Sequence, residues 1–97
     1  MSATDKLSEA ERLAETLGAI IGAASCCEQV TEERLGAVIT KLRPLILATA
    51  NDRGDAQSAN ERFSVAIDAG RIAAATGKVD PEDAEEAMRE MEKELST

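Results

Sequence analysis

The stretch LGAIIGAASCC, Leu17–Cys27, contains eleven residues without a charge and decides how this chain can fold. Its Leu and Ile residues recur at intervals of three and four, which is the periodicity of an α-helix and not the alternation of a strand. The positions between them are small or apolar, so this helix has no polar face. A helix that is apolar all round is normally buried all round.

The glycines of this stretch indicate what kind of contact buries it. Gly18 and Gly22 lie four residues apart, and a glycine inside a helix costs roughly 0.8–1 kcal/mol relative to alanine. Close approach of another helix offsets that cost, because a missing side chain lets two backbones come nearer. The covering helices belong either to a second copy of the chain or to this chain, with the first helix at its centre. We expect the second copy.

The rest of the chain predicts three further helices and no strand. Apolar residues recur with helical spacing in four segments that are separated by short polar turns. These segments are residues 5–28, 31–50, 56–76 and 81–95. The expected fold class is all-α, a small antiparallel bundle of four helices forming a single domain over residues 1–97.

Local signals refine these segments. Pro44 lies inside the second one and predicts a kink, because it lacks a backbone N–H and crowds the carbonyl of Thr40. Gly77 is expected to end the third helix in a left-handed conformation. Asp80 and Pro81 are typical of the cap and the first position of a helix, so the fourth helix is expected to start there.

The composition favours self-association. The chain has 97 residues, and Phe63 is its one aromatic residue. Aromatic side chains normally supply much of the burial in a core, and small domains are marginally stable even with them. A second apolar stripe on the third helix adds surface that four helices do not easily cover. We therefore expect a homodimer formed by the first and third helices, through Leu17, Gly18, Ile21, Gly22, Cys26, Val65, Ala69 and Ile72.

The net charge, the length of the uncharged stretch and the first residues argue against several kinds of partner and cellular location. The net charge is −8, which argues against direct binding to nucleic acid or to anionic lipid. Eleven uncharged residues are fewer than the ~20 that a membrane span needs. The first residues are polar and acidic, unlike a secretion signal. We expect a cytoplasmic protein that binds neither membrane nor nucleic acid.

The acidic end of the chain offers an alternative function. Residues 80–94 contain eight acidic and two basic residues, which is most of the net charge. Such a surface suits an antagonist that mimics the charge of a nucleic acid and occupies the basic site of a partner protein. The carboxylates expected to form it are Glu82, Asp83, Glu85, Glu86 and Glu90.

The chain lacks the residues that most catalytic and metal sites use. It contains no histidine, which is the commonest general base and the commonest metal ligand. It also contains no glycine-rich phosphate loop. We therefore expect no catalytic residue, no cofactor and no metal, and we expect that the protein is not an enzyme.

Cys26 and Cys27 carry the remaining candidate chemistry. Neighbouring Cα atoms lie 3.8 Å apart, below the usual disulfide range of 4.4–6.8 Å, and on a helix the two side chains point about 100° apart. We interpret them as two buried or half-buried free thiols, with Cys27 toward the core and Cys26 toward the self-association side. A disulfide between subunits, or a redox or metal switch at this pair, stays open as a third hypothesis.

Overall fold

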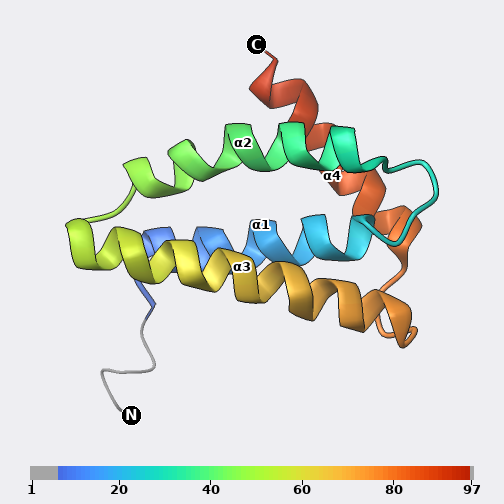
Figure 1. The fold of residues 1–97 in the computed structure, drawn as a ribbon, viewed down its shortest axis with the longest axis horizontal. Helices are drawn as coiled ribbons and strands as arrows, with labels where there is room; N and C mark the ends of the chain where they lie inside the picture. Colours follow the sequence, from blue (N-terminus) through green and yellow to red (C-terminus); the bar gives the residue numbers. More distant parts are fainter. Residues whose placement is uncertain (1–6, 97) are drawn as a thin grey trace.

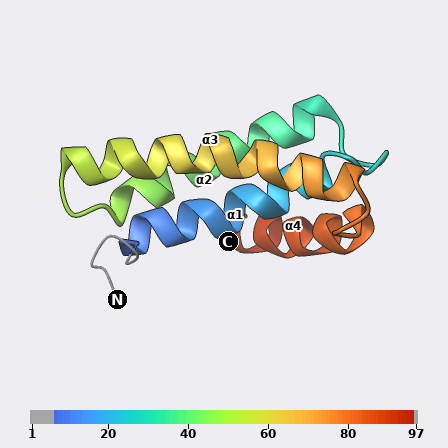
Figure 2. The same cartoon turned by 90° about the horizontal axis from the view of Figure 1, so that it is seen from below.

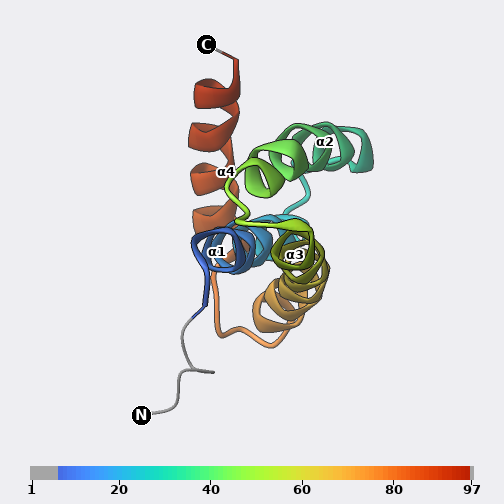
Figure 3. The ribbon, with the colours of Figure 1, turned by 90° about the vertical axis from the view of Figure 1, so that its left-hand side faces the viewer.

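The computed structural model describes residues 7–96 and confirms the four predicted helices. They are α1 (Glu9–Ala24), α2 (Glu32–Ala48), α3 (Arg53–Ala75) and α4 (Pro81–Leu95). Figure 1 shows α1 and α3 side by side and running in the same direction, while α2 runs back across them. Consecutive helices among the first three are therefore antiparallel, as expected for a small bundle. Helix α4 crosses α1 obliquely and accompanies only its second half (Figures 2 and 3).

The first helix is shorter than predicted. The predicted start at residue 5 lies outside the described residues. Ser8 caps α1, because its hydroxyl accepts the N–H of Glu11 and the Glu11 carboxylate accepts the N–H of Ser8. The predicted end at residue 28 is wrong: α1 ends at Ala24, and Cys26 and Cys27 lie in the turn that follows.

The other helix ends follow local signals. Helix α3 begins three residues before its predicted start, because the Asp52 carboxylate accepts the N–H of Asp55 at 2.8 Å and caps an earlier turn. Helix α2 continues through Pro44 without a break. Gly77 has a φ of 81°, which confirms the left-handed residue after α3. Asp80 caps α4, as predicted.

Helices α1 and α3 pack backbone against backbone. A Cβ atom placed on Gly22 would lie 1.9 Å from the carbonyl oxygen of Ile67, and one on Gly70 would lie 2.2 Å from that of Ala19. A Cβ atom placed on Gly18 would also meet α3, 2.8 Å from the carbonyl oxygen of Phe63. The close approach indicated by the glycines therefore exists, but the approaching helix belongs to the same chain.

Helix α1 is the central helix of the monomer. Its residues Ala10, Ala14 and Ile21 are fully buried, and the largest side chains buried with them are Phe63, Ile46 and Met88. Helices α2, α3 and α4 all contact α1 and bury most of its apolar stretch, including Gly18 and Ile21 to Ala24, whereas Ala19 stays exposed. Helices of the same chain therefore provide most of the cover that was expected from a second copy. Within residues 7–96 no helix combines the length and the apolar character that crossing a membrane requires.

Candidate functional site

The most exposed large apolar side chains lie on the outer face of α3. Val65 is 67% exposed and Ile72 is 62% exposed, although both lie inside a 23-residue helix. Ala69 lies between them and is exposed as well. We call these three residues the α3 ridge. Exposed apolar side chains are ordinary when they are scattered singly, but a row along one helix face indicates a contact surface.

A shallow groove between α1 and α3 runs beside this ridge. It consists of two hollows, of about 270 and 360 Å³, which share Ala19 and Ala69 and therefore adjoin. The α1–α3 pair is seen in Figure 2 from the side opposite α2. The first hollow is lined by Glu15, Ala19, Arg62, Val65, Ala66 and Ala69. The second is lined by Ala19, Ile20, Ala23, Ala69, Gly70, Ala73, Val79 and Ala84.

The structure separates the predicted self-association residues into two groups. Val65, Ala69 and Ile72 lie together on the α3 ridge. Residues from α1 do not join them: Ile21 is fully buried, and Leu17 is half-buried against the core. The two α1 glycines are buried against α3, and Cys26 is exposed at the end of α1. A self-contact therefore stays a prediction, and its accessible part is the ridge with the neighbouring groove.

A buried carboxylate changes the predicted acidic surface. Glu85 is 3% exposed, and its two oxygens accept hydrogen bonds from Arg34 at 2.9 Å and from Arg89 at 2.6 Å. Arg34 also binds Glu92 at 2.6 Å, so one guanidinium joins α2 to two carboxylates of α4. These arginines lower the pKa of Glu85, with Arg34 the larger cause, and the carboxylates raise the pKa of Arg34.

Sequence reasoning missed this cluster, since Arg34 and Glu85 are 51 residues apart. Expecting Glu85 on the acidic partner surface was wrong, because the side chain lies between two arginines and out of reach of a partner. The other four carboxylates of that surface are exposed on α4. They are Glu82, Asp83, Glu86 and Glu90.

A second polar cluster joins the starts of α1 and α3. The Glu11 carboxylate accepts hydrogen bonds from the Ser58 hydroxyl, the backbone N–H of Ser8 and the Nε of Arg62. These donors, with Ser58 the largest contributor, hold the pKa of Glu11 at about 2. The Ser8 hydroxyl in turn donates to Asp55 at 2.6 Å. This cluster fixes the register of the parallel α1–α3 pair.

Both clusters predict loss of stability in acid. A carboxylate whose pKa is lower in the folded chain stabilises the fold above its ordinary pKa, and this stability disappears as pH falls through the folded value. For Glu11 that window runs from 4.5 down to about 2, and Glu85 shifts in the same direction. We expect the urea midpoint to fall steeply across this window. Glu11→Gln should flatten the slope, whereas Glu61→Gln, which removes an exposed charge from α3, should leave it unchanged.

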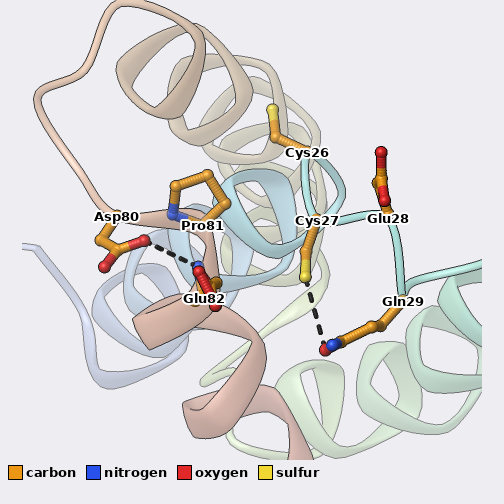
Figure 4. A pocket seen from close by; sticks show the side chains of 7 residues that line it. All are labelled: Cys26, Cys27, Glu28, Gln29, Asp80, Pro81 and Glu82. Carbon is orange, nitrogen blue, oxygen red and sulfur yellow. Dashed lines mark hydrogen bonds between the residues drawn. The ribbon is translucent and has the colours of Figure 1, made fainter.

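The two cysteines line a third hollow, between the end of α1 and the start of α4. It has a volume of about 380 Å³ and also contacts Glu28, Gln29, Asp80, Pro81 and Glu82 (Figure 4). The sulfurs point in different directions: Cys26 lies 3.5 Å from the carbonyl oxygen of Arg71, and Cys27 lies 3.7 Å from the side-chain oxygen of Gln29. Both thiols are free: Cys27 is buried, as predicted, whereas Cys26 is exposed, so the prediction that it is buried or half-buried is wrong.

The acidic residues of this hollow have local roles or face solvent. Asp80 caps α4, while Glu28 and Glu82 are exposed. Among residues 7–96 no three Cys, Asp or Glu side chains come together as metal ligands would. The thiol switch therefore stays a hypothesis without a built metal site in the described residues.

Comparison with known proteins identifies no relative. No protein-family model, no curated protein and no solved structure matches this chain. Its function has to be argued from its own surface.

Proposed function

We propose that this chain is a non-enzymatic helical protein that acts through protein contacts and associates with a second copy of itself. The observation that carries the proposal is the α3 ridge, where Val65 and Ile72 are both more than 60% exposed beside an apolar groove. Burying a side chain of this size contributes about 1.5–3 kcal/mol. In a symmetric contact both copies bury Val65 and Ile72, so four apolar side chains leave water. This favours association, because the entropy lost by ordering these side chains is small in comparison.

The charge distribution also supports a contact between copies. Helix α3 contains three acidic and three basic residues, so it is neutral within a chain of net charge −8. Two identical acidic molecules repel each other over most of their surfaces, and a neutral apolar face is where they can approach. The outer face of α4 is strongly acidic and suits a basic protein instead.

Sedimentation equilibrium at micromolar concentration tests the proposal. We expect a species of twice the 10.3 kDa chain mass, and we expect Ile72→Asp to weaken the dimer about 100-fold or more, because it replaces a buried apolar group by a charge. Leu45→Asp is the matched control, since Leu45 is 50% exposed on α2, outside the ridge. A wild-type chain that stays at 10.3 kDa contradicts the proposal.

Varying the salt and reductant concentrations distinguishes self-association from the two alternatives, which are an acidic antagonist and a thiol switch. A contact between apolar faces changes little with ionic strength, whereas binding of the acidic α4 to a basic protein weakens steeply as salt is added. A dimer that persists in reductant does not depend on a disulfide through Cys26. A dimer that dissociates in reductant favours the thiol switch instead.

A further inference from the structure

The exposed face of α3 has the spacing of a helix that packs against another helix. Arg62, Val65, Ala69, Ile72 and Thr76 follow one another at intervals of three, four, three and four residues. This is the repeat that keeps one seam of a helix facing a partner. Val65 and Ile72 are the large apolar side chains of the seam, one turn to either side of Ala69. A small residue at the middle of such a seam allows two helices to approach closely.

We infer that the two copies pack through α3 in an antiparallel arrangement, crossing at Ala69 about a two-fold axis. This inference rests on the proposed self-association and specifies its geometry. In such a contact each Val65 lies opposite Ile72 of the partner subunit, so the same apolar pair forms twice. The occupant of the surface is a second copy of this chain.

The direction of the contact follows from shape and not from charge. Arg62, the charged residue of the seam, is already paired with Glu11 and Glu15 of α1, so its charge favours neither direction.

The groove beside the ridge has a matching shape. Its two hollows lie to either side of Ala69, one near Val65 and Ala66 and the other near Ala73. The two large side chains of the ridge also lie to either side of Ala69. An antiparallel second copy therefore brings its Ile72 over the first hollow and its Val65 over the second. Each copy supplies both projections and both hollows, which is the self-complementarity that a two-fold contact requires.

Cysteine cross-linking tests this geometry. Ala69→Cys in a Cys26→Ser background puts one exposed thiol at the crossing point, where the two copies bring equivalent residues within disulfide range. Under mild oxidation we expect a covalent dimer on non-reducing gels, formed at least tenfold faster than with Thr76→Cys in the same background. Thr76 is the matched control because it is exposed on the same seam, seven residues from Ala69. In the antiparallel arrangement it lies opposite Arg62 of the partner subunit, whereas a parallel arrangement would bring the two copies of residue 76 together.

The outcomes distinguish this geometry from the proposed function. If the chain sediments as a dimer but Thr76→Cys cross-links as fast as Ala69→Cys, or faster, the antiparallel crossing is wrong while self-association stands. If the chain sediments as a monomer and neither variant cross-links, both are wrong. Rapid cross-linking through Ala69→Cys, with a normal helical circular dichroism spectrum, supports both.

Discussion

Gly22→Ala should lose about 3 kcal/mol or more of folding free energy, the largest effect that we expect from a single methyl group in this chain. The added Cβ would lie 1.9 Å from the carbonyl oxygen of Ile67 and 2.9 Å from the backbone nitrogen of Arg71. Both are backbone atoms, so no side-chain rotation relieves the clash and the two helices must move apart. Overpacking a core typically costs 1–3 kcal/mol, and a backbone clash lies at the upper end or beyond.

Gly36→Ala provides the matched control for that substitution. Gly36 also lies inside a helix, but a Cβ placed there has nothing within 4 Å. This variant should gain about 0.5–1 kcal/mol, because alanine restricts the unfolded chain and favours the helix. Urea unfolding followed by circular dichroism at 222 nm compares the two variants with the wild type. Equal stabilities for Gly22→Ala and the wild type would contradict the close packing of α1 against α3.

Arg34→Met should lower the melting temperature by about 10 °C at neutral pH, which is the second large effect that we expect. The substitution keeps much of the apolar stem but removes the guanidinium that binds both Glu85 and Glu92. Glu85 is then a buried carboxylate with Arg89 as its remaining charged partner, and Glu92 loses its bonds to α2. Breaking a buried pair by removing one member is costly because the other charge stays behind.

The pH dependence of this loss distinguishes the charge from the packing. Protonation removes the uncompensated charge, so the deficit of Arg34→Met should shrink as the pH is lowered through 4.5. Arg89→Met is the matched control, since it removes an exposed arginine that binds the same carboxylate within one turn of α4. Its effect should be clearly smaller. A deficit that is independent of pH, or equal in the two variants, would show that packing and not charge is lost.

The helices were predictable because their signals are local. The left-handed Gly77 after α3 and the cap of α4 at Asp80 depend on residues within one turn, and both are confirmed. The start of α3 was predicted three residues too late, although the Asp52 cap that sets it is a local signal as well. The bond from Ser58 inside α3 to Glu11 on α1 joins two helices, and such a contact has no local signal.

The contacts between helices were less predictable for a physical reason. The periodicity of a helix shows that a face must be covered, but it does not show which helix covers it. The close approach at Gly18 and Gly22 was correctly inferred, yet α3 of the same chain provides it. The burial of Glu85 depends on Arg34, which the fold brings across from another helix. Of the candidate surface, the exposed α3 ridge followed from the sequence, whereas the groove beside it required the structure.

The parallel pairing of α1 with α3 has a consequence for synthesis on the ribosome. The residues that meet in this pair, such as Ser8 and Asp55, are 47 positions apart, and α2 occupies the chain between them. Contacts of long sequence separation form late, since a long loop must close first. A nascent chain that ends at α2 lacks the helix that packs against Gly18 and Gly22, so this apolar side of α1 has no native cover until α3 has been synthesised.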